Sequence, residues 1–345
     1  MDRLIKKFSI VLFVLAWVLI GKVASATESS QQHESNVQVK HIDMYDEKRQ
    51  RPVKITVWFP AAHDCSDAIL CLAVNTKLDQ GAVFSHGAMG AARGYNWIGY
   101  ALASQGIVTV GLNHYGESWV YGQETIDMSA VLRFWERPRD VTFVLNQLSQ
   151  NFIKSGVNRR IFNRSMDWTN VTAIGHSSGG ATVAALAGSK LELIKAQKYC
   201  ATPASKGDKS CGYMKHQLAA AKEGYNPIES FQDKRIKRMI AMDPALGHVT
   251  NENSLKSIEI PVLVIGSKQN DFLTYDTHAG YYAKNIPQAQ NVVLDNGEGH
   301  FVYLDKCDHS YKAIGVSICT DRAGIDRSEV HKRIYPHLFG FIYGN

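Results

Sequence analysis

One pentapeptide constrains this chain more than any other feature. Residues 175–179 read Gly-His-Ser-Ser-Gly, which has the form Gly-x-Ser-x-Gly. Such a match occurs often by chance, so its surroundings decide what it means. The apolar run 171–174 precedes it and a stretch of small residues, 179–188, follows it. A strand, a tight turn and a helix would strain the central serine and expose its hydroxyl group. We therefore predict that Ser177 is a nucleophile at a strand–helix turn.

Short β-branched apolar runs alternate with helix-like segments over most of the chain. We predict strands at 81–85, 107–112, 171–175, 237–242, 262–266 and 291–294, after a β-hairpin at 39–59. We predict helices at 94–105, 137–150, 179–190, 212–223, 277–285 and 328–342. Apolar runs of this kind are typical of strands buried on both faces of a parallel sheet. Their alternation with helices predicts an α/β fold whose site lies at the carboxyl ends of the strands.

Residues 191–235 break this alternation. They contain two cysteines and several lysines but little strand pattern. This segment is either a cap or lid over the edge of the sheet, or a surface loop with one helix. The length of 345 residues allows two domains, but single α/β domains also reach this size. We expect residues 27–345 to form one domain, with 191–235 as the insertion.

The first 26 residues have the layout of a secretory signal peptide. Three basic residues come first, followed by the apolar run 8–20 and then Ala-Ser-Ala at 24–26. The apolar run is shorter than the roughly 20 residues of a membrane-spanning helix. We expect cleavage after Ala26 and a periplasmic or secreted mature protein without a stable membrane span.

The charge of the mature chain is nearly balanced. Removing residues 1–26 takes away four of the 38 basic side chains and one of the 32 acidic ones, which leaves a net charge of +3. No run of Lys and Arg interleaved with aromatic residues is present. These features argue against a nucleic-acid partner, and they give no indication of the oligomeric state.

Six cysteines lie in the mature part of the chain, as three close couples. An even number of cysteines in an exported protein indicates disulfide bonds. We predict the local pairs Cys65–Cys71, Cys200–Cys211 and Cys307–Cys319. The alternative is free buried thiols. A zinc site is the least favoured interpretation, because no Cys-x-x-Cys occurs and no histidine lies at ligand spacing from two cysteines.

A serine nucleophile needs a base and an acid. His300 follows the last predicted strand in a loop with two glycines, which suits the order serine, acid, histidine. His309 and His331 are expected at the surface, and His278 on a helix. Asp271 follows the strand 262–266 and is the preferred acid; Asp243, which follows 237–242, is the alternative, with Asp276 third.

The oxyanion formed during acyl transfer must be stabilised by hydrogen-bond donors. The loop after the strand 81–85 contains His86-Gly87 followed by the small residue Ala88. We expect the backbone N–H groups of Ala88 and of Ser178, the residue after the nucleophile, to bind the oxyanion. The alternative for His86-Gly87 is a simple turn.

Several segments together resemble bacterial α/β-hydrolases related to platelet-activating-factor acetylhydrolases and to the group known as predicted dienelactone hydrolases. The matching pieces are 51–60 (Arg-Pro-Val…Val-Trp-Phe-Pro), 85–90 (Ser-His-Gly-Ala-Met-Gly), 102–107, 137–145 (Arg-Pro-Arg-Asp…), 175–180, 261–266, 299–301 and 319–331. The resemblance covers about residues 40–343. It implies an α/β-hydrolase fold, a Ser–His–Asp triad and hydrolysis of esters with short or modified acyl groups.

The two groups of similar hydrolases imply different residues as the acid of the triad. The acetylhydrolase branch implies Asp243, whereas the predicted dienelactone hydrolases imply Asp271. True dienelactone hydrolases use a cysteine nucleophile, so Ser177 argues against that activity here.

The expected reaction is hydrolysis of a small-molecule or lipid ester through an acyl-enzyme, a reaction that requires no metal and no organic cofactor. The rival interpretations are a serine peptidase or amidase, and a non-catalytic binding protein on a hydrolase scaffold. Five aromatic residues follow the strand ends and either line an acyl pocket or pack under a loop: Tyr95, Trp97, Tyr115, Trp119 and Tyr121.

Overall fold

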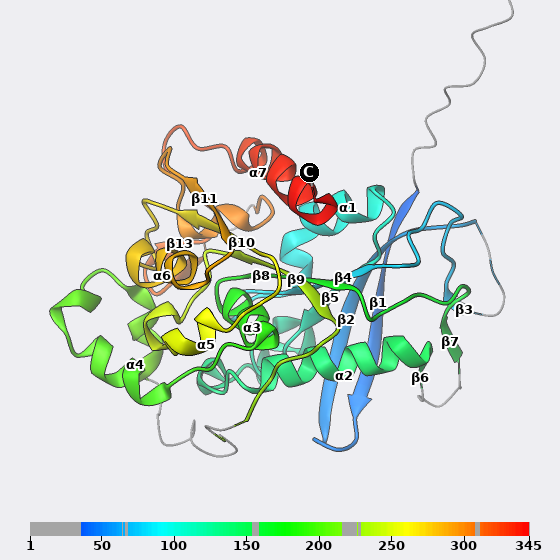
Figure 1. Ribbon diagram of the computed structural model, residues 1–345, viewed down its shortest axis with the longest axis horizontal. Coiled ribbons are helices and arrows are strands. Elements are labelled where there is room, and N and C mark those ends of the chain that lie inside the picture. The colour runs from blue at the N-terminus through cyan, green and yellow to red at the C-terminus, as the bar shows by residue number, and fades with distance from the viewer. Residues whose placement is uncertain are drawn as a thin grey trace, which may run out of the picture. The chain divides into compact units, whose positions relative to one another are not determined.

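An eight-stranded sheet with the order β1-β2-β5-β4-β8-β9-β10-β11 forms the centre of the protein (Figure 1). The computed structural model describes residues 36–63, 65, 68–153, 159–215, 226, 229–307 and 311–344. The strands are β1 (Val37–Asp46), β2 (Arg51–Pro60), β4 (Gly81–Ser85), β5 (Thr109–Asn113), β8 (Val171–His176), β9 (Ile236–Met242), β10 (Val262–Ser267) and β11 (Ala289–Leu294). Strand β2 is antiparallel to β1 and to β5, and all other neighbours are parallel. This is the predicted α/β-hydrolase fold: a mostly parallel sheet with an N-terminal hairpin.

Helices cover both faces of the sheet. Helices α1 (Asn96–Ser104) and α7 (Arg327–Tyr343) pack on one face. Helices α2 (Glu136–Gln150), α3 (Ser178–Ala187), α5 (Glu252–Lys256) and α6 (Ala279–Asn285) pack on the other. Every residue of β4, β5, β8 and β10 is buried, because helices lie on both sides of these strands.

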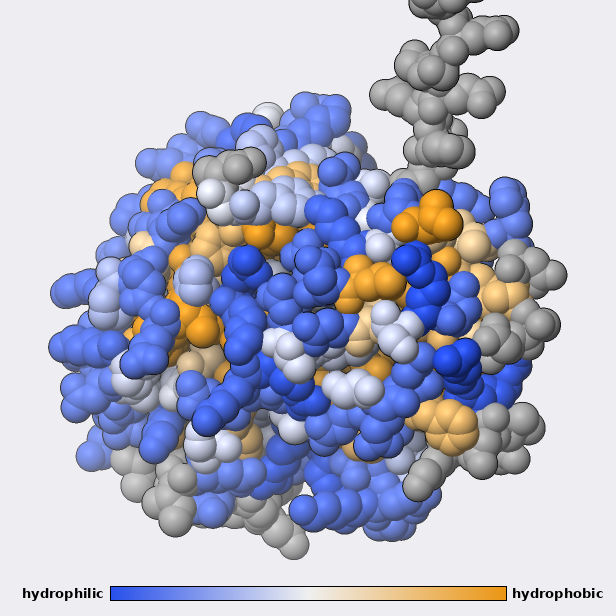
Figure 2. All heavy atoms as spheres, turned by 45° about the vertical axis from the view of Figure 1, so that its right-hand side comes forward, coloured by the Kyte–Doolittle hydropathy of each residue, from blue (hydrophilic) through white to orange (hydrophobic). Residues whose placement is uncertain are grey.

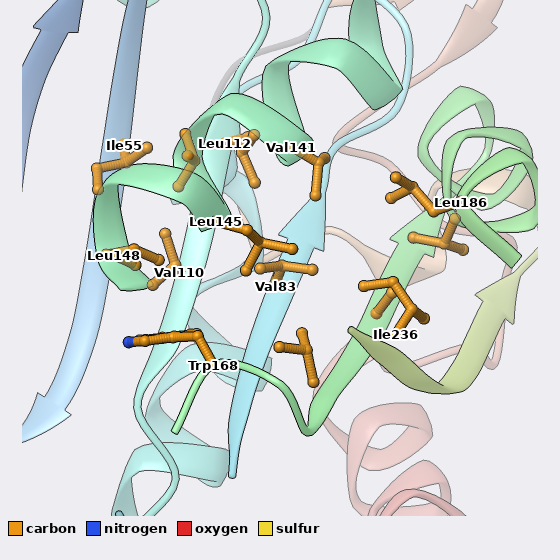
Figure 3. Close-up of a cluster of buried hydrophobic side chains, with 14 of the residues drawn as sticks. Ile55, Val83, Val110, Leu112, Val141, Leu145, Leu148, Trp168, Leu186 and Ile236 are labelled. Atoms are coloured by element: carbon orange, nitrogen blue, oxygen red, sulfur yellow. The ribbon is translucent and has the colours of Figure 1, made fainter. Parts of the chain in front are cut away.

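The larger of the two main cores lies between α2 and the sheet (Figure 3). Helix α2 presents Val141, Leu145 and Leu148 at helical spacing, and these side chains meet Val83 and Val110 of the sheet. Full burial of each such side chain contributes roughly 1.5–3 kcal/mol. The helix ends at Asn151, which has a left-handed backbone (φ 51°), a common way for a helix to terminate.

The segment 191–235, called the cap below, connects α3 to β9. Its described part contains α4 (Leu193–Cys200) and the 3₁₀ helices η5 (Pro203–Ser205) and η6 (Lys209–Lys215). The helix predicted at 212–223 overlaps the end of η6, and most of its span lies outside the described residues.

The sequence pattern did not predict several short elements. They are the small sheet β3 (Ala68–Leu70), β7 (Arg159–Phe162) and β6 (Phe152–Ile153), and the hairpin β12 (Lys312–Ala313) and β13 (Val316–Ser317). The other 3₁₀ helices are η1 (Ala92–Tyr95), η2 (Trp119–Tyr121), η3 (Gln123–Thr125), η4 (Met128–Leu132), η8 (Gly247–Val249), η9 (Tyr275–Thr277) and η10 (His300–Tyr303). Strands of two or three residues are too short to show an alternating pattern.

Three disulfide bonds close local loops: Cys65–Cys71, Cys200–Cys211 and Cys307–Cys319. Three disulfides are consistent with a location outside the cytoplasm. The expected signal peptide, residues 1–26, lies outside the described residues. Within the described chain, no helix combines the length and the apolar character needed to cross a bilayer. One face of the surface is mostly hydrophilic, with hydrophobic residues in separate patches (Figure 2).

Candidate active site

Ser177 occupies the sharp turn between β8 and α3. Its backbone has φ 56° and ψ −120°, a strained conformation for a residue with a side chain. A Cβ atom on Gly175 would collide with the carbonyl of Gly179, and one on Gly179 with the carbonyl of Ser85. The two glycines therefore allow the backbone to pack closely enough to make this turn.

His300 lies next to the serine. It begins η10, shortly after β11, and its Nε2 atom lies 2.9 Å from Ser177 Oγ. Burial lowers the pKa of His300 to about 3, so the imidazole is neutral at ordinary pH. A neutral imidazole at this distance can accept the hydroxyl proton. The sequence-predicted pair is thus brought together from positions more than 120 residues apart.

The three candidate acids occupy different environments. The Asp243 carboxylate lies 3.5 Å from Nδ1 of His300 and is fully buried. Asp271, which the sequence favoured, instead accepts the backbone N–H of His300 through Oδ1 at 2.9 Å. Asp276 is exposed and pairs with Lys268 at 3.5 Å. Of these three carboxylates, that of Asp243 is the one that lies beside Nδ1 of the His300 ring.

Asp243 is held by neighbouring donors. Its Oδ1 accepts the N–H of Ser267 at 2.7 Å, and its Oδ2 accepts from Asn270 Nδ2 at 2.8 Å. Asn270 Nδ2 also lies 3.2 Å from His300 Nδ1, so this amide sits between the acid and the base. Burial raises the pKa of Asp243 to about 8, although the Ser267 hydrogen bond acts in the opposite direction.

His176, inside the pentapeptide, connects the base to the loop after β4. Its Nε2 atom donates to the carbonyl of His300 at 3.0 Å. Its Nδ1 then accepts from the Tyr95 hydroxyl at 2.8 Å, and that hydroxyl accepts the N–H of Gly87 at 3.1 Å. Sequence reasoning did not assign these roles to His176 and Tyr95. The signal available was the position of His176 directly before the nucleophile.

The loop after β4 lies against the nucleophile. A Cβ atom on Gly87 would come within 3.3 Å of Ser177 Cβ, so a side chain here would press on Ser177. Ser178 is the first residue of α3, whose N-terminal amides lack intrahelical partners. Within the described chain, neither Ala88 nor Ser178 is found donating its N–H to a protein acceptor. Of the two expected oxyanion donors, Ser178 directly follows Ser177 in the chain, and Ala88 follows Gly87 in the loop that lies against it.

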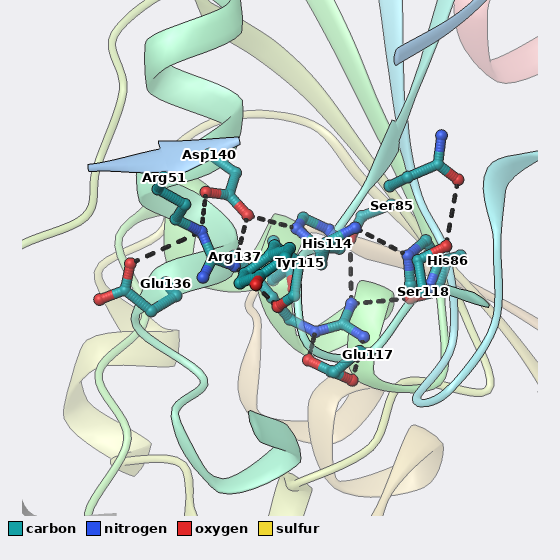
Figure 4. Close-up of polar contacts among 12 residues, drawn as sticks. Arg51, Ser85, His86, His114, Tyr115, Glu117, Ser118, Glu136, Arg137 and Asp140 are labelled. Carbon is teal, nitrogen blue, oxygen red and sulfur yellow. Dashed lines mark hydrogen bonds and ion pairs between the residues drawn. The ribbon is translucent and has the colours of Figure 1, made fainter. Parts of the chain in front are cut away.

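Arg137 of α2 fixes the carbonyl groups of the same loop (Figure 4). Its guanidinium group donates to the carbonyls of His86 at 2.8 Å and Gly87 at 3.4 Å, and it forms a two-point pair with Glu117. Burial alone would raise the pKa of Glu117, but the Arg137 charge outweighs it and lowers that pKa. Because the carbonyls are turned toward Arg137, they do not repel an oxyanion.

A second serine–histidine–aspartate series lies beneath this loop. His114 contacts Ser85 Oγ through Nε2 and Asp140 through Nδ1, both at 2.9 Å, and Arg51 donates to Asp140 at 2.8 Å (Figure 4). Burial alone would raise the pKa of Asp140, but Arg51 and His114 hold it well below its ordinary range. All three members of the series are at most 1% exposed. We interpret them as a support for the loop, because no reactant can reach Ser85.

Apolar side chains lie beside Ser177 and His300. Phe272 stacks on the His300 ring with centroids 5.2 Å apart. Phe272, Leu273, Ala245 and Tyr213 of the cap form one buried cluster, against which Ala88 and Phe301 pack. Ser177 is only 6% exposed. The hydroxyl group is therefore reached past an apolar cover to which the cap contributes.

Several expected surface or pocket residues lie elsewhere. His331 is buried rather than exposed: it stacks on Trp97 and donates to the carbonyl of Val302, because α7 packs on the sheet. Trp97 is therefore a packing residue, and so is Tyr121, whose hydroxyl accepts the N–H of Lys54. His278 directly precedes α6. His309 lies outside the described residues.

No protein-family model matches the chain, and no curated protein was found to match its sequence. Among solved structures, the chain is similar to a ferulic acid esterase from Streptomyces cinnamoneus. The two share 16% sequence identity, the match covers 81% of this chain and 78% of that chain, and the TM-score is 0.47. A likeness at this level concerns the fold alone.

Proposed function

We propose that this protein is a serine hydrolase that cleaves carboxylic esters through an acyl-enzyme. The observation that carries the proposal is the contact of 2.9 Å between Ser177 Oγ and His300 Nε2, at a strand–helix turn where Ser177 has φ 56°. Asp243, and not Asp271, is the proposed acid, because its carboxylate lies beside Nδ1 of the same ring. The backbone N–H groups of Ala88 and Ser178 are the proposed oxyanion donors.

In the proposed reaction, His300 Nε2 takes the proton of Ser177 as Oγ attacks the ester carbonyl carbon. Asp243 stabilises the imidazolium that results, and the two amides hold the oxyanion. The imidazolium gives its proton to the leaving alcohol oxygen as the ester bond breaks. A water molecule, activated by the same imidazole, then releases the carboxylic acid from Ser177. Each step uses side chains and amides of this chain.

The cover over Ser177 suggests the kind of ester. Phe272, Phe301, Leu273 and Tyr213 would meet the substrate around the reacting carbonyl. Apolar and aromatic side chains favour an uncharged acyl group, because a charged group would lose its hydration without a partner. An ester with an apolar or aromatic acyl group therefore fits this surface better than an acidic one.

A fluorophosphonate probe tests the proposal directly. The mature protein, with its disulfides intact, is expected to react at one residue, and peptide mapping is expected to place the adduct on Ser177. A panel of p-nitrophenyl esters and matched anilides then measures ester against amide hydrolysis. Faster turnover of the esters supports the proposal, faster turnover of the anilides would make the protein an amidase, and no labelling with no turnover would refute both.

The pH dependence of kcat/KM is expected to show a rising limb that levels off above about pH 8. Burial raises the pKa of Asp243 to about 8, and the reactive form needs this carboxyl group ionised and His300 neutral. Losing a proton therefore activates the enzyme, and kcat/KM should fall about tenfold for each unit of pH below the pKa. A pH-stat assay with an uncharged ester from about pH 5 to about pH 10 measures this. A flat profile between about pH 6 and about pH 9 would contradict it.

A further inference from the structure

A second cluster of ionisable side chains lies between the cap and the sheet. Asp208 precedes η6 in the cap, His248 lies in η8 after β9, and His278 directly precedes α6. One ligand atom from each residue lies within 4.8 Å of the others. Asp208 Oδ2 and His278 Nε2 are 2.6 Å apart, and both of these side chains are at most 1% exposed. Segments 70 residues apart thus meet at one buried point.

The carboxylate and one imidazole of this cluster are oriented by neighbours. Asp208 Oδ1 accepts from the backbone N–H of Ser210 at 3.0 Å and from its hydroxyl group at 2.6 Å. Asp208 Oδ2 accepts from the Tyr199 hydroxyl at 3.1 Å and faces His278 Nε2 at 2.6 Å. Tyr199 stacks on the His248 ring with centroids 3.8 Å apart. Neighbours that fix a carboxylate and an imidazole in this way are typical of groups that ligate a metal ion.

The hydrogen bonds inside the cluster are incomplete. In the described part of the chain, the Nδ1 atoms of His248 and His278 are both buried and have no hydrogen-bond partner. A buried polar nitrogen without a partner is destabilising, so two in one cluster indicate that something else belongs there. No lysine or arginine side chain in the described chain pairs with Asp208; its ion-pair partner there is His278.

We propose that Asp208, His248 and His278 bind a divalent transition-metal ion, with Zn²⁺ favoured by the donor set. Two imidazoles and one carboxylate are ligands that Zn²⁺ accepts, with water in a fourth position. No metal site was predicted from the sequence, and the site proposed here is separate from the ester chemistry. The sequence could not predict this site from the spacing of its ligands, because Asp208, His248 and His278 come from three separate segments.

The metal would fasten the cap to the catalytic domain. Asp208 lies within the loop that the Cys200–Cys211 disulfide closes, whereas His248 and His278 follow the strands β9 and β10. His278 also lies along one narrow crevice with Asp243 and Asn270. A metal at this place would hold the disulfide-closed part of the cap against the loops that carry the proposed acid.

Metal content and thermal unfolding test this proposal without any ester assay. The mature wild-type protein, stripped with a chelator, dialysed against Zn²⁺ and then against metal-free buffer, is expected to retain about one Zn²⁺ per chain by elemental analysis. Added Zn²⁺ is expected to raise its unfolding temperature by about 5 °C. Asp208→Asn, which keeps the size of the side chain and its hydrogen-bonding oxygen, and His248→Gln are each expected to lower the retained zinc to about one tenth.

The control is His337→Gln, which changes an exposed histidine of α7 and should retain zinc like the wild type. Two results would overturn the proposal. One is a wild-type protein that retains no zinc and shows no change in unfolding temperature. The other is zinc that stays in both Asp208→Asn and His248→Gln, which would place the metal elsewhere. Because these readouts involve no turnover, they succeed or fail independently of the proposed esterase activity.

Discussion

Replacing Ser177 with Ala is expected to lower kcat for ester hydrolysis by roughly 10⁴- to 10⁶-fold, because it removes the atom that forms the acyl-enzyme. The remaining rate would come from the oxyanion amides and from binding, which the substitution leaves in place. The KM should change little, since the hydroxyl group contributes mostly in the transition state. Steady-state kinetics on a p-nitrophenyl ester gives both constants, and the fluorophosphonate probe should no longer label the protein.

A matched serine controls this experiment. Ser104→Ala removes a hydroxyl group at the end of α1, where the side chain is exposed and donates to the carbonyl of Ala101. This variant should keep wild-type kinetics and labelling. Because Ala keeps the Cβ atom of Ser, the strain of the Ser177 backbone is unchanged, and the unfolding temperature of Ser177→Ala should stay close to that of the wild type. Wild-type turnover in Ser177→Ala would remove the basis of the proposed function.

The sequence predicted the sheet well because its strands are buried on both faces. The run 262–266 contains no polar side chain and 239–242 is apolar, and the structure has β10 and β9 at these places. The same reasoning could not find β6 or β12, each of which has two residues. It also placed His331 at the surface, because a single histidine on a helix gives no sign of the Trp97 ring that stacks on it.

Ser177 and His300 could be proposed from the sequence as nucleophile and base because each follows a strand and has glycines beside it. The acid could not be, since Asp243 and Asp271 both follow strands that end at the same sheet edge. The two aspartates differ in backbone conformation and in the hydrogen bonds of their carboxylates. Asp243 has φ 38°, and the N–H of Ser267 and the amide of Asn270 hold its carboxylate beside the ring. Spacing along the chain carries no information about such side-chain directions.

The residues that support the loop after β4 could not be predicted from the sequence, for a related reason. Arg137 and Asp140 fall in a segment that matched the family pattern, but nothing in that segment pointed to the carbonyl of His86 or to the ring of His114. Both contacts join α2 to loops more than 25 residues earlier in the chain. Contacts of this kind follow from how α2 packs on the sheet, and that packing is specified by its apolar face rather than by its charged residues.

Exchanging each competing carboxylate for an amide should separate the two aspartates. Asp243→Asn is expected to lower kcat by roughly 10³- to 10⁴-fold, because a neutral amide cannot stabilise the imidazolium and can impose the wrong tautomer on His300. Asp271→Asn is expected to lower kcat by less than about tenfold. Its side-chain oxygen can still accept the N–H of His300, which is the contact that Asp271 Oδ1 makes at 2.9 Å. Steady-state kinetics of both variants, at a pH above the rising limb, measures the difference.

The two variants also differ in the form of their pH profiles. Because the rising limb is assigned to Asp243, it should disappear from Asp243→Asn and persist in Asp271→Asn. This readout distinguishes loss of the acid from a loss of folding, which would lower the rate without changing the limb. If Asp271→Asn instead gave the larger loss and abolished the limb, the carboxylate beside Nδ1 would not be the one that acts. The Asp271 loop would then have to turn toward the ring during the reaction, so that this carboxylate exchanges its contact with the His300 backbone for one with Nδ1.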